Sequence, residues 1–383
     1  LTQAPLKNWL KENAYYNDDT SGHTEPSYGD DYDSEDNAVN QFVSYHLLPE
    51  RLTFDKLVTF ANEYGCSAGM MSSRTATQFY VNVWEYWETM GKQRRSVKVT
   101  GIRGEKRINR VSVYNLTTYR ERTSEITIPG IKINANNGSY NNQALNGYYY
   151  PIDDILVWNQ DVPTKVLNER MRYDVTSLFP ELLTNGIRQN RNRDECGDGY
   201  WYFTTDYIDN VVAMSNETEF IYLPNQGYSG ASGSWMNYQI DEFNIRGQYD
   251  FTMKLPPVPR AGQYEIRFGV ATGSYVRSMA QVYFGSDPEN MPVAGIPMDL
   301  RLGGLEIHGG EFHGEPSGRS QLRKASFFVW LARESDGELL RVHPGDGCLS
   351  HVIPFRERYE QGECRARTGS HRRGSYLGGV EAV

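Results

Sequence analysis

The sequence predicts an α+β domain followed by an all-β sandwich. Up to about residue 190, helical patterns alternate with runs rich in β-branched and aromatic residues. From 195 to 307, short alternating strands are separated by turns such as "PPVPRAG" and "GSDPEN", which is typical of a sandwich. With 383 residues the chain is too long for one ordinary core, so we expect more than one domain.

Composition excludes several classes of function. The formal net charge is -9, and the first 300 residues contain no Lys/Arg block that could serve as a phosphate-binding face, so nucleic acid is not an expected partner. No run approaches eighteen apolar residues, so no transmembrane span is expected. The cysteines are far apart and form no CxxC pair, which argues against a disulfide scaffold or a zinc site; they are Cys66, Cys196, Cys348 and Cys364.

The chain opens with a helical pattern and then becomes strongly acidic. Leu6, Trp9 and Leu10 are spaced for one face of a helix. Because this helix begins at Leu1 without a leader, we expect the chain to start inside a domain. Residues 17–37 are polar and acidic, so they are interpreted as a solvated insertion loop.

The acidic loop resembles a calcium loop only superficially. Asp31, Asp33 and Glu35 have the spacing of its first ligands. However, Asp36 and Phe42 stand where that loop needs a glycine and a bidentate glutamate. We therefore expect no metal site here.

The remaining elements of the first domain follow in order. A helix capped by Thr53 is expected over "RLTFDKLVTFANEYG". Strands are then predicted over "TATQFYVNVWEYWE", "RINRVSVYN", "SEITIPGIKINA" and "GYYYPIDDILVW", with "NANNGS" as a turn that tolerates positive φ. Helical segments over "TKVLNERMRYDVTSLFPELLTNGI" close the domain.

His46 follows Tyr45 in the apolar run "FVSYHLLPERLTFDKLV", and its chemistry needs weighing. A general base needs an orienting carboxylate and a nucleophile, and a zinc site needs three or four ligands. Before residue 308 the sequence offers one other histidine, His23. A structural role is therefore favoured, in which the imidazole lies at the edge of an apolar strand and bonds to nearby backbone groups. A binding role is the alternative.

The same run resembles the Tyr-His segment of fasciclin (FAS1) domains: an apolar run, Tyr-His, a turn containing Pro, and a helix opened by a Leu-Thr pair. "ITIPGIKINANNG" followed by "NGYYYPIDDILV" resembles the closing strands of that family. The resemblance covers roughly residues 1–160. The family's opening strand is missing, and the acidic loop is an insertion. The resemblance implies a FAS1-like domain over 1–190, truncated at its N-terminus.

The resemblance also carries functional expectations. It implies a non-enzymatic adhesion protein without cofactors, exported to a bacterial cell surface or outer membrane. Tyr45 and His46 are the adhesion candidates, because this pair is implicated in adhesion in the family. The expected partner is an extracellular protein or a glycan. A signal sequence and a lipid anchor are expected upstream of Leu1.

The sandwich suggests an alternative function. "GQYDFTMKLPPVPRAGQYEIRF" resembles paired strands of the jelly-roll, galactose-binding-like modules that follow FAS1 domains in surface proteins of gut Bacteroidetes. Exposed aromatic rings are what sugars stack on. The aromatic residues around the Gly/Ser turn are Trp201, Tyr202, Tyr222, Tyr228 and Trp235. If these rings are exposed, they would form a carbohydrate-binding site. If they are buried, they are core residues.

The tail, residues 308–383, has a different composition from the preceding chain. It holds five of the seven histidines, ten Arg against one Lys, and no Asn. This break is typical of residues read in a shifted frame or left disordered. The alternative is a small Arg-rich module in which "ASFFVWLA" and "ELLRVH" form a hairpin. No function is assigned to the tail.

Overall fold

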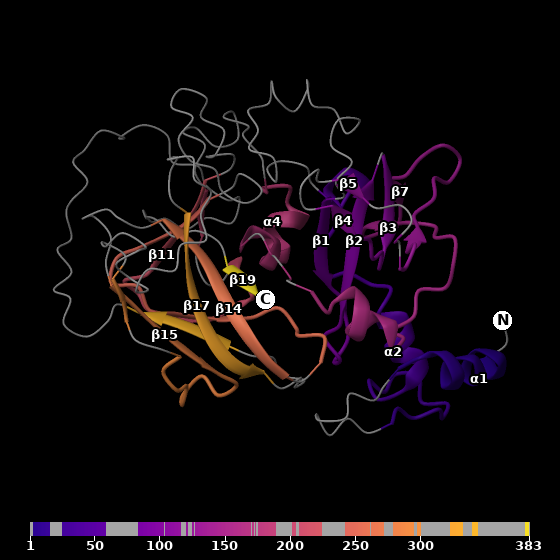
Figure 1. The fold of residues 1–383 in the computed structure, drawn as a ribbon, viewed down its shortest axis with the longest axis horizontal. Coiled ribbons are helices and arrows are strands. Elements are labelled where there is room, and N and C mark those ends of the chain that lie inside the picture. Colours follow the sequence, from indigo (N-terminus) through magenta and orange to yellow (C-terminus); the bar gives the residue numbers. More distant parts are fainter. Residues whose placement is uncertain are drawn as a thin grey trace.

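The computed structural model describes most of the first segment and parts of the second. The described residues are 3–15, 25–58, 83–102, 104–115, 120–121, 125, 127–169, 171, 173, 175–188, 201–203, 207–223, 242–260, 262–271, 279–294, 297–299, 322–331, 339–343 and 380–382. They form a mixed fold with several antiparallel sheets and few helices (Figure 1). The coarse prediction of a mixed first segment followed by a β-rich second segment is therefore confirmed.

A four-stranded antiparallel sheet forms the centre of the first segment. Its order is β1 (Val83–Glu88), β2 (Ser96–Ile102), β3 (Glu105–Ile108) and β6 (Ile131–Lys132). β2 is buried along almost its whole length, so both faces of this sheet are covered. Two small ribbons accompany the sheet: β4 (Tyr114–Asn115) with β5 (Arg120–Glu121), and β7 (Asn142–Gln143) with β8 (Tyr148–Tyr149).

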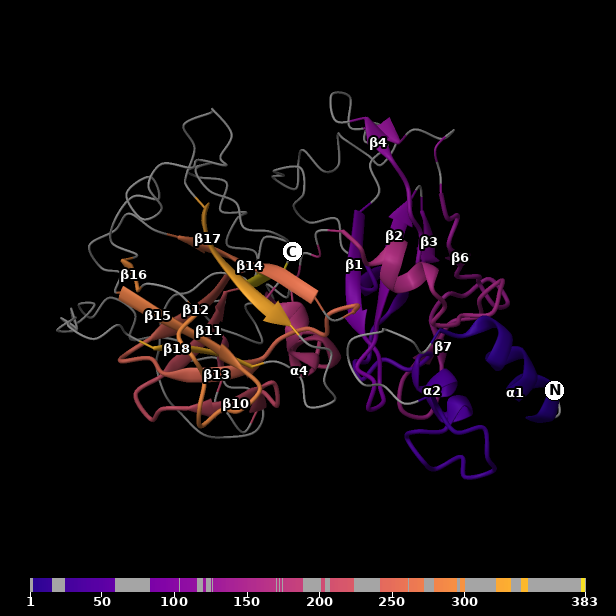
Figure 2. The same cartoon turned by 60° about the horizontal axis from the view of Figure 1, so that its bottom comes forward.

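Two helices precede the sheet. α1 (Gln3–Asn13) buries Leu10 completely and lies at the end of the molecule opposite β15 and β16 (Figures 1 and 2). α2 (Ala38–Ser44) ends at Tyr45. The strand expected around His46 is therefore wrong, because the run preceding it is a helix.

The acidic insertion is partly ordered by the helices around it. Residues 16–24 lie outside the described part of the chain. In the rest, the Ser27 amide donates to the Asp36 carbonyl at 2.8 Å, and Lys7 forms an ion pair with Asp30 at 2.6 Å. The loop therefore packs against α1 and returns to the start of α2.

The other helical predictions appear as short turns where they are described, and residues 59–65 of the helix expected over "RLTFDKLVTFANEYG" lie outside the described residues. η1 (Phe54–Lys56) is a 3₁₀ turn, and the Thr53 side chain makes no cap bond to it, so the predicted cap is wrong. The closing helical segments appear as a π-turn, η3 (Val162–Val166), a 3₁₀ turn, η4 (Val175–Leu178), and α4 (Pro180–Thr184). Prolines at the starts of η3 and α4 set these boundaries.

The second segment consists of antiparallel strands, as a sandwich requires. One three-stranded sheet has the order β12 (Glu242–Arg246), β11 (Glu219–Leu223), β9 (Trp201–Phe203). A five-stranded sheet has the order β10 (Val211–Met214), β13 (Phe251–Lys254), β18 (Leu339–His343), β15 (Met279–Gly285), β16 (Met298–Asp299). A third sheet has β14 (Gly262–Ala271) between β17 (Leu322–Leu331) and β19 (Val380–Ala382).

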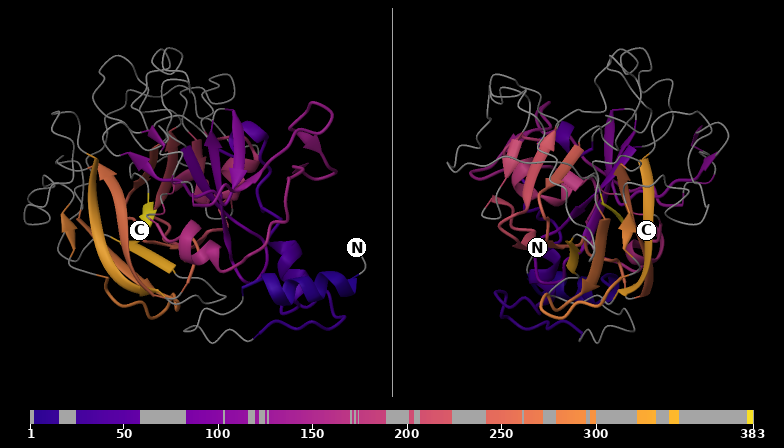
Figure 3. Two further views of the ribbon diagram at one scale, coloured as in Figure 1. Left: turned by 45° about the vertical axis from the view of Figure 1, so that its right-hand side comes forward. Right: turned by 90° about the vertical axis from the view of Figure 1, so that its left-hand side faces the viewer.

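Three of these strands come from the anomalous tail. β17 pairs with β14 along their whole length, as Figure 3 shows, and β18 lies between β13 and β15. The two tail runs are strands, but they belong to different sheets. The hairpin considered for them is therefore not formed.

The two segments contact one another directly. Buried side chains of both belong to one continuous cluster that extends from Tyr45 to Phe284. Polar contacts join them as well: Arg94 donates to the Leu255 carbonyl at 2.9 Å, and Asn185 donates to the Tyr207 hydroxyl at 2.8 Å. In the part of the chain that is described, no helix has the length and apolar character needed to cross a membrane.

Candidate functional site

The Tyr-His segment is positioned by the cap of α2. Asn37 is fully buried, and its Oδ1 accepts from the Val39 amide at 2.9 Å, which satisfies an otherwise unpaired N–H at the helix start. Its Nδ2 donates to the Gly29 carbonyl in the acidic loop at 3.1 Å. One side chain thus fixes both the helix and the loop that precedes it.

Tyr45, at the end of α2, is a core residue. Only 2% of it is exposed, and its ring contacts Trp158 edge-on with 5.6 Å between centroids. The hydroxyl donates to the Ser96 carbonyl at 3.4 Å and accepts from Asn109 Nδ2 at 3.0 Å. Tyr45 therefore fastens α2 to the sheet and presents no surface to a partner.

His46, the next residue, is exposed. Its Nδ1 lies 2.7 Å from the Phe42 carbonyl, so this nitrogen carries the proton and donates it. The ring packs edge-on against Phe42, with centroids 4.6 Å apart. The predicted bond from the imidazole to nearby backbone is confirmed. A base would need the opposite nitrogen, Nε2, aimed at a nucleophile, and no such group accompanies it among the described residues.

Three exposed apolar residues lie close to His46 along the chain or through a backbone contact. Val43 is three residues before it and Leu47 directly after it, and they are 50% and 46% exposed; Met90 is 48% exposed. The Met90 amide donates to the Leu47 carbonyl at 2.8 Å, so the turn after β1 lies against the turn after α2. We call Val43, His46, Leu47 and Met90 the Tyr-His surface. Exposed apolar residues that cluster in this way are typical of interaction sites, whereas single ones are not.

A glycine allows the two turns to approach. Gly91 has a φ of 97°, and a Cβ added to it would lie 2.8 Å from the Cβ of Ser44 on α2. Real side chains do not tolerate such a contact, and the positive φ disfavours any other residue as well. The turn 89–95 can therefore meet α2 at this point only with glycine.

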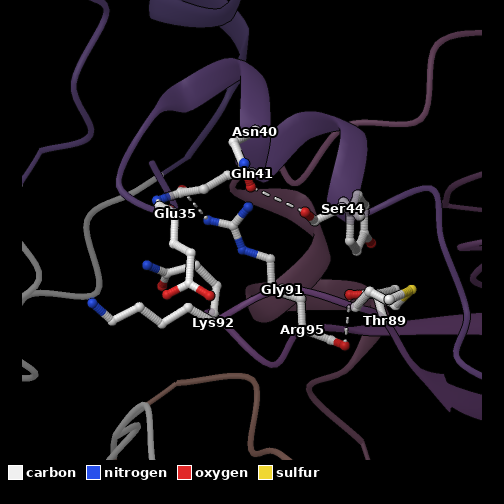
Figure 4. A pocket seen from close by; sticks show the side chains of 11 residues that line it. Glu35, Asn40, Gln41, Ser44, Thr89, Gly91, Lys92 and Arg95 are labelled. Atoms are coloured by element: carbon white, nitrogen blue, oxygen red, sulfur yellow. Dashed lines mark hydrogen bonds between the residues drawn. The ribbon is translucent and has the colours of Figure 1, made fainter. Parts of the chain in front are cut away.

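Beside the surface lies a small polar recess between α2 and the turn 89–95 (Figure 4). Its polar groups bond mainly to each other. Ser44 donates to Asn40 Oδ1 at 3.2 Å, and Arg95 donates to Gln41 Oε1 at 3.4 Å. Thr89 donates to the Arg95 carbonyl at 3.0 Å. The serine is bonded to an amide and not to a base, so the recess lacks the pairing that activates a nucleophile.

A second polar cluster, on the sheet, was not anticipated from the sequence. The carboxylate of Glu169 accepts from the Tyr86 hydroxyl at 2.7 Å and forms an ion pair with Lys98, while Trp84 Nε1 donates to the Tyr86 hydroxyl at 2.9 Å. Burial lowers the pKa of Lys98 despite this partner, and burial beside Glu169 raises the pKa of Tyr86. Every group is committed to a neighbour, so the cluster holds residue 169 against the sheet.

Three carboxyl groups of the first segment, those of Glu50, Glu88 and Glu181, are close enough to interact electrostatically. Burial raises the pKa of Glu50 to about 8, with smaller effects of Glu88 and Glu181. Oε2 of Glu50 and Oε2 of Glu181 are buried without hydrogen-bond partners, whereas Glu88 is paired with Arg94 at 2.7 Å. Within the described residues, no group of His, Cys, Asp or Glu could hold a metal ion.

The expected sugar-stacking residues are placed differently. Trp201 and Tyr222 face each other across β9 and β11, and both are buried. A buried ring offers no face to a sugar, so the stacking role expected for these two is corrected to a role in the core. Tyr202, which follows Trp201 and lies opposite Ile221, is half-buried. Tyr228 and Trp235 lie outside the described residues.

Comparison of the chain with protein-family models and with curated proteins finds no match.

Proposed function

We propose that the chain is a non-enzymatic adhesion protein of the fasciclin type, which contacts a protein partner through the Tyr-His surface. The main support for the proposal is that the adjacent residues Tyr45 and His46 differ in their environment. Tyr45 is buried and bonded to the sheet, while His46 is presented among three half-exposed apolar side chains. Apolar anchors with a polar rim are typical of the centre of a protein–protein interface.

A protein partner fits this surface better than a sugar. Apart from the imidazole of His46, the surface consists of aliphatic side chains and a thioether, and it contains no Trp or Tyr ring, the larger rings on which sugars stack. Charges of both signs lie at its edge, with Lys92 3.7 Å from Asp36. The fasciclin resemblance of the Tyr-His segment supports the same function, and cell-surface location, export and a FAS1-like domain with a jelly-roll-like module are proposed on that resemblance.

The experiment is a bead adhesion assay with the full chain. Beads that carry the chain are applied to surfaces coated with the same chain, with fibronectin or with laminin. Leu47→Ser and His46→Ala should each reduce retention on the surface that binds, while the melting temperature changes little because both residues are exposed. A matched control is Val212→Ser, an exposed apolar residue on β10.

Three results would contradict the proposal. Retention could be unchanged in the Leu47 and His46 variants, or it could fall equally in the Val212 control. It could also fall only in proportion to a loss of stability. The third result would show that Leu47 and His46 stabilise the fold and do not bind the partner.

A further inference from the structure

A second surface lies on the two turns between β6 and β8. Between Lys132 and Asp153 the sequence contains no charged residue, although 23% of the chain is charged. The stretch instead holds six Asn and four Tyr, together with Gln, Ser and Gly. Amides, small residues and tyrosines are the combination that recognition loops use for adaptable hydrogen bonds and rigid contact area.

The first turn is tightly closed. Asn136 and Ser139 exchange backbone hydrogen bonds at 2.8 and 2.9 Å, and Asn137 and Gly138 between them have φ values of 50° and 81°. These are the residue types that adopt left-handed conformations at low cost. The exposed amide of Asn137 is therefore held on a fixed backbone.

The second turn is the hairpin of β7 and β8, of which β7 is labelled in Figure 1. It packs against the first turn. Asn142 Nδ2 donates to the Ser139 carbonyl at 3.4 Å, and Asn136 Nδ2 donates to the Tyr149 hydroxyl at 3.4 Å. Tyr149 is 49% exposed. The two turns thus present one continuous surface with an aromatic ring beside several amides.

The other tyrosines of the stretch are engaged elsewhere. The Tyr140 ring stacks on Phe54 at 4.0 Å, and the Tyr148 ring lies under the guanidinium of Arg51 at 5.1 Å. The Tyr150 hydroxyl donates to the Leu52 carbonyl at 2.6 Å. Tyr149 is the one of the four whose ring is half exposed and stacked on no neighbour among the described residues.

We propose that Asn136, Asn137, Ser139 and Tyr149, which we call the amide surface, bind a neutral glycan. An amide offers a donor and an acceptor side by side, which matches neighbouring sugar hydroxyls, and the Tyr149 ring supplies a face for the sugar C–H groups. The absence of charge gives no complement to a charged polysaccharide. A protein interface would centre on clustered apolar anchors, whereas Leu145 is a single exposed apolar residue at the hairpin tip.

The test is affinity electrophoresis of the full chain in native gels that contain soluble starch, xyloglucan or galactomannan, with polygalacturonate as the charged comparison. The wild-type chain should be retarded by at least one neutral polysaccharide. Tyr149→Ala should weaken that binding about tenfold, the effect expected from loss of a stacking ring. Tyr149→Phe keeps the ring and should retain most of the binding.

Tyr148→Ala is the matched control, because Tyr148 is the adjacent ring on the opposite face of the same hairpin. It should leave retardation unchanged, and melting curves confirm that each variant is folded. The proposal is overturned if no neutral polysaccharide retards the chain, if polygalacturonate alone does, or if Tyr148→Ala weakens binding as much as Tyr149→Ala. Self-association that Tyr149→Ala abolishes in gels without polysaccharide would also overturn it, because the surface would then contact a second copy of the chain.

Discussion

Asn109 donates its Nδ2–H to the hydroxyl of Tyr45 at 3.0 Å, across a sequence separation of 64 residues. Asn109 has a φ of 54°, and its Oδ1 accepts from the Lys98 amide at 3.1 Å. The end of α2 is thus joined to the inner strands of the sheet through one buried amide.

Tyr45→Phe should lower stability without removing the ring from the core. The substitution leaves Asn109 Nδ2 buried without an acceptor, which costs about 1–3 kcal/mol. Tyr45→Ala also leaves a cavity and should cost about 3–5 kcal/mol. Urea unfolding of both variants measures the difference. Equal losses would mean that the hydroxyl contributes and the ring does not, which contradicts the packing against Trp158.

Gly91→Ala should be more destabilising than Gly104→Ala. Both glycines have positive φ, so alanine is strained at either by about 1–2 kcal/mol. At position 104 nothing lies within 4 Å of the added Cβ, whereas at 91 it would meet Ser44. The excess loss at position 91, measured by thermal melting, reports the contact between the turn 89–95 and α2. Equal losses would show that this contact relaxes without cost.

Glu85 and Arg188 form a buried bidentate ion pair with distances of 2.8 and 2.9 Å. Arg188→Met removes the bidentate partner of the buried Glu85 carboxylate and should cost about 3–5 kcal/mol. The double variant Glu85→Leu/Arg188→Met removes both charges and should recover most of that loss. Denaturant unfolding of the single and double variants tests this. A double variant no more stable than the single one would contradict it.

Stability should fall as the pH rises, through Glu50. The pKa of Glu50 is about 8 in the folded chain, above its ordinary value of 4.5, so the folded state holds a proton that the unfolded state has lost between those pH values. The slope is therefore negative from about pH 4.5 to 8, and above 8 the full cost is present. At pH 8.5 the wild-type chain carries a charged, largely buried carboxylate, whereas Glu50→Gln is neutral at this position, so the variant should be the more stable chain. The difference should be on the order of 1–2 kcal/mol, since water partly reaches the wild-type carboxyl and reduces the cost.

At pH 4 the wild-type chain and Glu50→Gln should unfold at nearly the same denaturant concentration, since both carry a neutral group at position 50. Parallel pH profiles for the two would show that Glu50 titrates normally in the folded chain. The fall in stability would then arise from other groups.

Local signals in the sequence identified some elements well. The "NANNGS" turn was predicted from its Asn-Gly pair, and Asn137 and Gly138 do adopt positive φ. The first helix was predicted from the spacing of Leu6, Trp9 and Leu10. These features depend on a few neighbouring residues, so the local sequence is sufficient to predict them.

Other features depend on tertiary contacts and could not be predicted from the sequence. The apolar run before His46 suggests a strand, but it forms α2, and Asn37 in "SEDNAVNQF" is the sequence signal for the start of that helix. Tyr45 and His46 are one candidate pair in the sequence, but Tyr45 is buried and His46 is exposed. Composition also could not tell that Trp201 and Tyr222 are core residues or that Glu169 meets Lys98, since each depends on which strands pair.

The alternation of buried Tyr45 with exposed Val43, His46 and Leu47 separates the residues that hold this part of the chain from those that it displays. Under the proposed adhesion function, substitutions at the displayed positions would alter the choice of partner at little cost to folding. Changes at these three positions would then give related proteins different partners, while Tyr45 keeps the helix in the same place.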